Sequence, residues 1–344
     1  MINRFGQQSF DSFAYYFPFP NVQSYTFVID AWANSNDPRA GKKALDMIRQ
    51  PGFKPNARFI SSTIEAIHKS RGDDMVPLEL IKQMVVLNKS GDDSSLANSK
   101  TFTKAISKGD AQNALDVLKY LDELGDQSLG PNSVHINAVI ASLSKSDLPD
   151  RIETAEALFQ RLKKDQTADI ITYTAMISAL ANCDEINKCD RAEKLLHDME
   201  EYGIAPSTRV YNAVIKACGN GNKKGAGDRA LSLVKRMEKE YTEGNLRVKP
   251  DVITYTNACS ALRNDSQIYN KAKYLLRHVT KPDIIFYTNI LDLLCRNSRE
   301  TSLLLAENIL DRMDARYKSG ELQMQPNSYI INMVCELVKS LYCT

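Results

Sequence analysis

The side chains that could do chemistry in this 344-residue chain form one scattered group and one regularly spaced group. The scattered group comprises four histidines and seven cysteines. The regular group is an Asn, Asp or Ser directly after a proline, as in Pro55-Asn56, Pro131-Asn132, Pro206-Ser207, Pro250-Asp251, Pro282-Asp283 and Pro326-Asn327. Proline disfavours helix in the residue before it, and an Asn, Asp or Ser after it can cap the next helix. The regular group therefore predicts a series of helix starts.

The scattered group lacks the spacing of an active site. Its histidines, His68, His135, His197 and His278, lie in different parts of the chain. There is no His-x-Glu with a Cys-x-x-Cys, and there is no glycine-rich phosphate loop. The sequence therefore predicts that the chain is not an enzyme, and it indicates no cofactor and no small-molecule substrate. His135, at the expected start of a helix, is interpreted as a surface histidine.

The seven cysteines have no regular framework, which favours a reducing compartment. Cys218, Cys259, Cys295 and Cys335 occupy helix positions whose counterparts are Leu, Ile or Ala, and we expect them to pack in the core. Cys183 and Cys189 are six residues apart and could in principle bind a metal ion. Because no second pair and no nearby histidine supports them, no metal site is predicted.

The elements that must position the regular group are pairs of helices. An alanine followed by apolar residues at +3, +4 and +7 recurs along the chain, at Ala44 (without an apolar +7), Ala114, Ala155, Ala192, Ala230, Ala272 and Ala306. These spacings lie on one face of a helix, which we name helix B. Upstream lies helix A, which opens on an aromatic or aliphatic residue with apolar residues at +4 and +7. Tyr173, Ile177 and Leu180 show this spacing well.

The two helices recur with a period of about 35 to 40 residues, which is typical of a stacked-repeat architecture. Repeats start near residues 22, 57, 99, 133, 170, 208, 252 and 284, and a partial one starts at 328. One hairpin buries too little apolar surface to offset the entropy of ordering it. We therefore expect residues 22–344 to form one continuous all-α solenoid of antiparallel helix-turn-helix repeats. Residues 1–21, rich in aromatics, are interpreted as an N-terminal cap or the remnant of something longer.

Composition limits the partners. The 44 Lys and Arg nearly cancel the 42 Asp and Glu, so any binding of nucleic acid must be local rather than by bulk charge. Hydrophobic residues make up an ordinary 43%, and no run approaches the length of a membrane span. No membrane partner is predicted. Residues 1–21 have the pattern of neither a signal peptide nor a transit peptide.

The repeat resembles the pentatricopeptide repeat family. The resemblance is carried by 169–174 (Asp-Ile-Ile-Thr-Tyr-Thr), 210–215 (Val-Tyr-Asn-Ala-Val-Ile), 249–256 (Lys-Pro-Asp-Val-Ile-Thr-Tyr-Thr) and 281–288 (Lys-Pro-Asp-Ile-Ile-Phe-Tyr-Thr), and the first repeat, 22–56, spans 35 positions. The tetratricopeptide repeat pattern, with a Trp and a Gly-x-x-Tyr on helix A, is absent. The resemblance implies a right-handed superhelix in which helix A lines a groove for single-stranded RNA, one nucleotide per repeat. It also implies a role in mitochondria or plastids.

In that family, the residue after the helix A opener and the residue after the closing proline read the edge of one base. Carried over, the pairs are Thr26 with Asn56, Ser61 with Asn98, Thr103 with Asn132, Asn137 with Asp169, Thr174 with Ser207, Asn212 with Asp251, Thr256 with Asp283, and Thr288 with Asn327. An amide suits the acceptor N1 of adenine, whereas a carboxylate suits the N–H of uracil or guanine. The pairs imply the target A-A-A-U-purine-U-G-A.

The resemblance also implies a base-stacking residue two positions before the opener. Val134, Ile171, Ile253 and Ile285 fit this role, and Arg209 could stack as a cation, whereas Gln23, Arg58 and Lys100 depart from the pattern. In the third repeat, only 12 residues separate the opener from the helix B alanine, against 19 in five other repeats. This spacing predicts a shorter helix A and a displaced Thr103.

Two other interpretations stay open. Any single Thr or Asn at these positions could be only a helix cap or a turn residue. The alternative function is a protein-binding scaffold of the tetratricopeptide-like kind, in which the groove holds a peptide. Binding to RNA should weaken steeply with added salt and depend on sequence, whereas binding to a peptide should do neither.

Overall fold

The computed structural model describes residues 22–35, 37–48, 55–69, 78–82, 85, 99–125, 130–219, 225–265, 267–296 and 300–342. Every regular element in these ranges is helical, which confirms the all-α class. No helix in the described ranges combines the length and the apolar character that crossing a membrane requires. The predicted cap at 1–21 lies outside the described residues.

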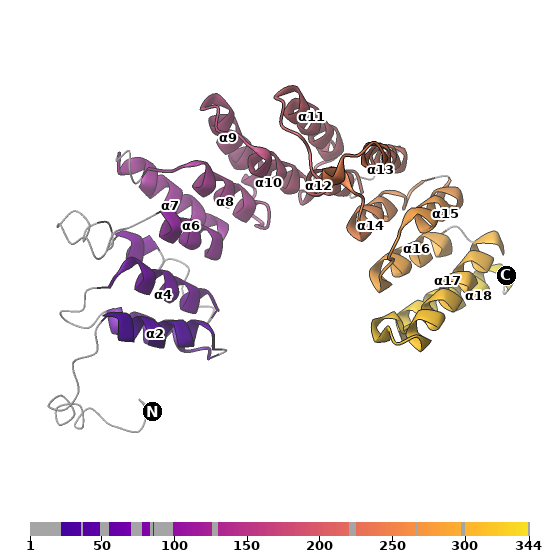
Figure 1. Ribbon diagram of the computed structural model, residues 1–344, viewed down its shortest axis with the longest axis horizontal. Coiled ribbons are helices and arrows are strands. Elements are labelled where there is room, and N and C mark those ends of the chain that lie inside the picture. Colours follow the sequence, from indigo (N-terminus) through magenta and orange to yellow (C-terminus); the bar gives the residue numbers. More distant parts are fainter. Residues whose placement is uncertain are drawn as a thin grey trace, which may run out of the picture. The chain divides into compact units, whose positions relative to one another are not determined.

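The helices are of the two kinds that the sequence predicts, and they alternate along the chain except between α4 and α6, where only the helical residues 78–82 and 85 are described (Figure 1). Helices A are α2 (Val22–Ala33), α4 (Ala57–Lys69), α6 (Ser99–Lys108), α8 (Ser133–Leu143), α10 (Ile170–Ala181), α12 (Thr208–Gly219), α14 (Val252–Ala261), α16 (Ile284–Arg296) and α18 (Ser328–Tyr342). Helices B are α3 (Ala40–Ile48), α7 (Ala111–Glu123), α9 (Arg151–Lys164), α11 (Lys188–Glu201), α13 (Ala226–Thr242), α15 (Ile268–His278) and α17 (Glu300–Lys318). Two short 3₁₀ helices, η4 (Leu246–Val248) and η5 (Leu322–Met324), precede α14 and α18.

The chain divides into two compact units, 1–148 and 149–344, whereas the repeat pattern predicts one continuous core. In the first unit, α2, α4, α6 and α8 pack in sequence order, each on the next. In the second unit, α10, α12, α14, α16 and α18 do the same. Each helix B of the second unit packs on flanking helices A. The boundary falls between α8 and α9, where Pro149 and polar residues interrupt the helices, as is usual at domain boundaries.

The core follows the repeated sequence pattern. All seven helix B alanines, Ala44, Ala114, Ala155, Ala192, Ala230, Ala272 and Ala306, have no exposed surface. Three helix A tyrosines, Tyr173, Tyr211 and Tyr255, are also buried, and each donates a hydrogen bond to an acidic residue of a helix B. Tyr173 donates to Asp198 (2.8 Å) and Tyr211 to Glu240 (3.0 Å). A buried tyrosine needs such a partner for its hydroxyl. The hydrogen bond therefore explains why an aromatic with a polar end can open helix A.

Ion pairs join successive helices B in the second unit. Lys163 of α9 pairs with Asp198 of α11 (2.7 Å), and Arg191 of α11 pairs with Glu156 of α9. The pattern continues with Arg229 and Glu193 (2.5 Å), Arg236 and Glu200 (2.5 Å), and Lys271 and Asp228 (2.5 Å). We call these five pairs the helix B ladder. Each partly exposed pair contributes about 0 to 1 kcal/mol, so the ladder adds little to stability.

The cysteines differ from the sequence interpretation. Cys218 of α12 forms a disulfide with Cys189 at the start of α11, rather than packing as a free thiol. Cys259 is buried as predicted, Cys295 is half-buried, and Cys335 is exposed, because the face of α18 that carries it has no helix packed over it among the described residues. Glu193 lies near the disulfide, with possible ligand atoms within 4.8 Å. In the disulfide neither sulfur is a thiolate, and Glu193 is engaged by Arg229, so this cluster has no free metal ligands.

Candidate functional site

The threonines predicted to read bases share one conformation. Each donates its hydroxyl hydrogen to the carbonyl four residues earlier in its own helix, over 2.6 to 2.8 Å, at Thr26, Thr103, Thr174, Thr256 and Thr288. A hydroxyl has one donor and two acceptor sites. These threonines therefore keep acceptor capacity for a ligand, but no donor. Thr103 shares this conformation, and its displacement in the short third repeat stays a prediction.

The residues after the closing prolines, or at the equivalent position, are mostly helix N-caps. One side-chain oxygen accepts from the backbone N–H three residues later, over 2.7 to 3.1 Å, at Asn56, Asn132, Asp169, Asp251, Asp283 and Asn327. Ser207 makes no such bond in the described part of the chain. Capping uses only one of the two polar atoms of an amide or carboxylate. The capping interpretation and the ligand interpretation are therefore compatible at the same residue.

One predicted pair meets directly. The Asn212 amide of α12 donates to Asp251 Oδ1 at the start of α14, over 3.1 Å. Thr254 donates to Asn212 Oδ1 (2.6 Å), and Asn257 donates to the Asn212 carbonyl (3.0 Å). Asp251 is exposed, although one of its oxygens is enclosed by this network. Asn212 and Asp251, from adjacent repeats, therefore form one hydrogen-bonded polar group.

A second predicted pair meets through a third residue. Thr103 donates to the Ser99 carbonyl (2.8 Å), and the Asn132 amide donates to the Ser99 hydroxyl (3.1 Å). Ser99 is the first residue of α6, so it brings both members of the pair to the start of that helix. The sequence interpretation did not single out Ser99.

The other six pairs are not brought together by hydrogen bonds in the described part of the chain. Asn98, the predicted partner of Ser61, lies outside the described residues. Asn137 belongs to the first unit and Asp169 to the second. Four pairs remain: Thr26 with Asn56, Thr174 with Ser207, Thr256 with Asp283, and Thr288 with Asn327. In the described part of the chain, their side-chain hydrogen bonds stay within one helix and its cap.

Asn137 has an unusual environment. Its side chain is 7% exposed, and its Oδ1 atom has no hydrogen-bond partner among the described residues. Buried polar atoms are nearly always hydrogen-bonded, so an exception calls for an explanation. A bound group that donates to this amide oxygen would supply one.

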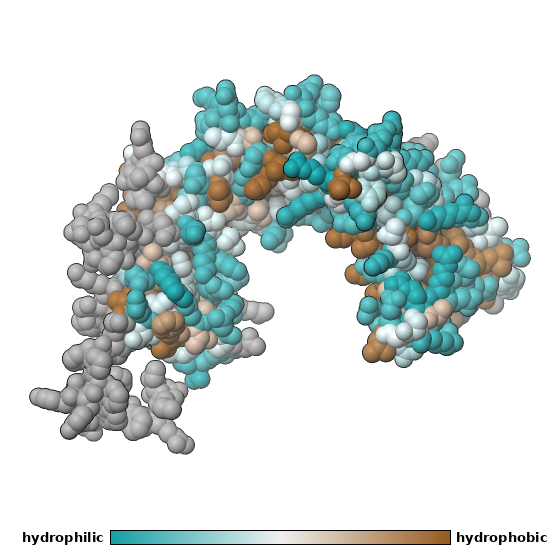
Figure 2. Space-filling model, viewed as in Figure 1, coloured by the Kyte–Doolittle hydropathy of each residue, from teal (hydrophilic) through white to brown (hydrophobic). Residues whose placement is uncertain are grey.

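Exposed aliphatic side chains lie beside these polar groups. Val134, Ile171, Ile253 and Ile285 are 52% to 60% exposed, although each belongs to a helix with a buried apolar face. Each precedes a predicted base-reading residue by three positions, which places the two on one helix face. Figure 2 shows apolar side chains at the otherwise hydrophilic surface of the second unit. Apolar and hydrogen-bonding groups therefore alternate along the exposed ends of helices A.

Two further residues occupy the stacking position. Arg209 is exposed on α12, as its predicted role requires. Tyr329, on α18, is 60% exposed, and the sequence interpretation missed it. Counting from Pro326 would have found it, because Tyr329 follows that proline by the same three residues that separate Ile285 from Pro282.

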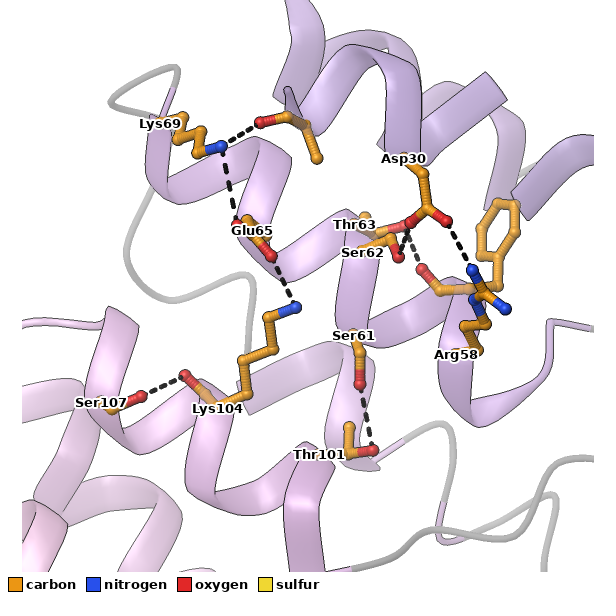
Figure 3. A network of polar contacts seen from close by, with 12 residues as sticks. Asp30, Arg58, Ser61, Ser62, Thr63, Glu65, Lys69, Thr101, Lys104 and Ser107 are labelled. Atoms are coloured by element: carbon orange, nitrogen blue, oxygen red, sulfur yellow. Dashed lines mark hydrogen bonds and ion pairs between the residues drawn. The ribbon is translucent and has the colours of Figure 1, made fainter. Parts of the chain in front are cut away.

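Arg58, which departs from the stacking pattern, is engaged within the protein (Figure 3). Its guanidinium pairs with Asp30 of α2 (3.1 Å) and lies 6.0 Å from the centre of the Phe27 ring. Asp30 also accepts a hydrogen bond from Ser62. In the same view, Ser61 of α4 contacts Thr101 of α6, with 3.2 Å between the hydroxyl oxygens.

His135 is buried, at 1% exposure, and the prediction of a surface histidine is wrong. The Asn132 N–H donates to His135 Nδ1 (3.2 Å), and Nε2 lies 3.1 Å from the Ser99 carbonyl oxygen. A carbonyl only accepts, so Nε2 carries the proton and Nδ1 is bare. The ring therefore completes a capping box at the start of α8, which a surface histidine could not do.

We expect acid to destabilise the α8 cap. Burial lowers the pKa of His135 below its ordinary value, although the hydrogen bond to the Ser99 carbonyl opposes this shift. A folded-state pKa below the unfolded one, about 6.5, means that the stabilising contribution is present above that pH and is lost as the pH falls. Protonated Nδ1 would also face the Asn132 N–H. Urea unfolding of wild type and His135→Gln between pH 7.5 and 5 should show wild type losing more stability.

Glutamine is the matched variant because it also suits this capping-box position and does not titrate in this range. A free-energy difference between the two proteins that stays constant with pH would contradict the assignment of His135 as the titrating group.

Comparisons with known proteins agree with the architecture. The family model described as "Pentatricopeptide repeat domain" matches residues 157–221. Similar curated proteins are pentatricopeptide repeat-containing proteins of Arabidopsis thaliana. One is 27% identical over 177 residues, which is 51% of this chain and 18% of the relative. Another is 30% identical over 121 residues, which is 35% of this chain and 25% of the relative. A third, named chloroplastic, is 26% identical over 146 residues, 42% of this chain and 16% of the relative.

Among solved structures, the crystal structure of the pentatricopeptide repeat protein PPR10 in complex with an 18-nt PSAJ RNA element is similar. The match has a TM-score of 0.50 and 18% identity, and it covers 94% of this chain and 49% of that chain. At this identity the likeness shows the fold alone. The fold and the repeat pattern define a helical-repeat protein. The family-model match and the similar curated proteins support a pentatricopeptide repeat protein. It spans about a quarter or less of the length of the curated relatives that it matches.

Proposed function

We propose that this chain binds single-stranded RNA through the exposed ends of helices A, with one nucleotide per repeat. The observation that carries the proposal is the alternation of exposed aliphatic side chains, such as Ile253 and Ile285, with hydrogen-bonding side chains one helical turn away. A nucleobase has apolar faces and a polar edge, so it needs both kinds of contact. PPR10, which resembles this chain in fold, was solved in complex with RNA.

The hydrogen-bonding capacity of the paired residues supports the predicted target. A threonine that has donated its proton can accept from adenine N6–H, while an asparagine amide such as that of Asn132 can donate to adenine N1. At the Asn212 and Asp251 pair, the hydrogen bonds to the Asp251 carboxylate within the described residues go to Oδ1, so Oδ2 can accept from uracil N3–H. This gives a physical basis for the target A-A-A-U-purine-U-G-A.

The proposed action is occupancy: bound protein protects, remodels or presents a transcript in RNA processing, stability or translation. No catalytic step is part of the proposal. One curated relative is named chloroplastic, and the relatives are plant proteins, which supports a mitochondrial or plastid location.

Selection of bound RNAs from a random pool tests this function. We expect a consensus that contains the predicted U and G at adjacent positions, and binding that weakens steeply as salt rises, since phosphate contacts release counterions. A protein that binds no RNA, or binds it with no consensus, would overturn sequence-selective binding. Salt-independent capture of a peptide would favour the scaffold function instead.

A further inference from the structure

From α4 onward, the third residue of each described helix A is buried, and in two repeats it contacts the predicted base-reading residue of the preceding repeat. Thr254, third in α14, is 0% exposed and donates to Asn212 Oδ1 over 2.6 Å. Thr101, third in α6, is 1% exposed, and its hydroxyl lies 3.2 Å from that of Ser61 (Figure 3). The two contacts occur in different units, so the same arrangement forms twice independently.

At Thr254 the contact belongs to a network that fixes an amide. Asp251 Oδ1 accepts from the Thr254 N–H (2.9 Å) and from the Asn212 amide (3.1 Å). Asn212 Oδ1 accepts from the Thr254 hydroxyl. A flip of the Asn212 amide, which exchanges Oδ1 with the amide nitrogen, would lose the hydrogen bond to Asp251. Asn212 keeps one N–H and one lone pair, next to the second oxygen of Asp251. Thr254 thereby orients both members of the predicted pair.

In several of the described repeats the contact is absent for a chemical reason. The third residues of α12, α16 and α18 are Val210, Phe286 and Ile330, which have no side-chain donor. In the repeats before them, Thr174, Thr256 and Thr288 bond instead to a carbonyl of their own helix. In α8 the third residue is His135, which is occupied by Ser99 and Asn132. Thr172, third in α10, does have a hydroxyl, but it donates to Asp169 of its own helix cap (2.9 Å), and Asn137 of the preceding repeat belongs to the other unit. Among the described repeats of one unit, the contact therefore follows the side chain at this one position.

We propose that Thr254 and Thr101 are positioning residues for base selection in the preceding repeat. The nucleotide preference of a repeat then depends on three residues, the third being supplied by the following repeat. This inference rests on the proposed RNA binding. It predicts that two repeats with the same base-reading pair differ in selectivity when the next helix A has a hydroxyl residue or an apolar residue at its third position.

The test compares Thr254→Val with Thr254→Ser. Binding would be measured to the predicted RNA, and to the same RNA with cytosine at the nucleotide assigned to Asn212 and Asp251. Valine keeps the shape and removes the hydroxyl, so we expect the preference for uracil over cytosine to fall about 3- to 10-fold. Serine keeps the hydroxyl, so its preference should stay within about 2-fold of wild type. Discrimination at the neighbouring nucleotide, assigned to Thr256 and Asp283, should not change in either variant.

A structural role alone would lower affinity for all the RNAs equally, or lower the thermal midpoint, without changing the ratio at one nucleotide. A Thr254→Val protein that keeps the wild-type ratio overturns the positioning role while leaving the proposed function standing. A wild-type protein that binds these RNAs without preference overturns both. Thr101→Val repeats the test in the first unit, with discrimination at the nucleotide assigned to Ser61 as the readout.

Discussion

Asp251→Asn should move the nucleotide preference of one repeat from uracil to cytosine. The carboxylate accepts only, and it suits uracil N3–H, whereas an amide can donate to the bare N3 of cytosine. One good base contact gives about 1–3 kcal/mol of discrimination, so the ratio of uracil to cytosine affinity should fall about 10- to 100-fold. Titration of the four RNAs that differ at this nucleotide measures the change.

The variant should remain folded, because Asn and Asp are equivalent as N-caps and the Thr254 N–H keeps an acceptor. Asp283→Asn is the matched control: it caps α16 in the same way, but it should alter only the adjacent nucleotide. An unchanged preference in Asp251→Asn would show that the carboxylate does not meet a base.

Tyr211→Ala should destabilise the second unit by about 3–5 kcal/mol, the range for truncating a large buried aromatic. Tyr211 has no exposed surface, and its hydroxyl donates to Glu240 of α13 (3.0 Å). The Arg236 guanidinium lies 5.6 Å from the centre of its ring. Truncation therefore leaves a cavity, and both Glu240 and Arg236 lose their contact with the tyrosine side chain. The midpoint and slope of urea unfolding, followed by circular dichroism, measure the loss.

Tyr211→Phe distinguishes the free-energy cost of the cavity from the cost of losing the hydroxyl's hydrogen bond. It should cost only about 0.5–1.5 kcal/mol, because Glu240 retains its bond to Arg236 (2.9 Å) while losing the tyrosine. If the alanine variant costs no more than the phenylalanine variant, the ring does not belong to the core that the repeats share.

The parts of the fold that repeat in the sequence could be predicted, because apolar spacing directly reflects the buried face of a helix. Ala230 and Tyr211 are buried for this reason. The caps could also be predicted, because Asp251 and its equivalents follow a proline that ends one segment and are free to start the next. The capping geometry is local, so it needs no knowledge of neighbouring repeats.

Contacts between repeats could not be predicted in the same way. Cys189 and Cys218 are joined by the relative rotation of α11 and α12, which apolar spacing does not specify. The burial of His135 depends on Ser99, which lies 36 residues earlier. The contact of Thr254 with Asn212 spans 42 residues, and the pattern within one repeat gave no sign of it. Each of these features depends on how one hairpin sits against the next.

The helix B ladder has a consequence for anyone who would rebuild this protein with a different order of repeats. Each ion pair of the ladder has its cation on one hairpin and its anion on a neighbouring hairpin, as in Arg229 with Glu193 and Lys271 with Asp228. A hairpin that is moved alone would carry one member of an ion pair and leave the partner in the neighbouring hairpin. Like charges could then face each other at the new contacts between hairpins. Repeats should therefore be exchanged as blocks whose boundaries fall where no ion pair of the ladder joins the two helices B. Where a boundary does interrupt an ion pair, both of its residues should be substituted together.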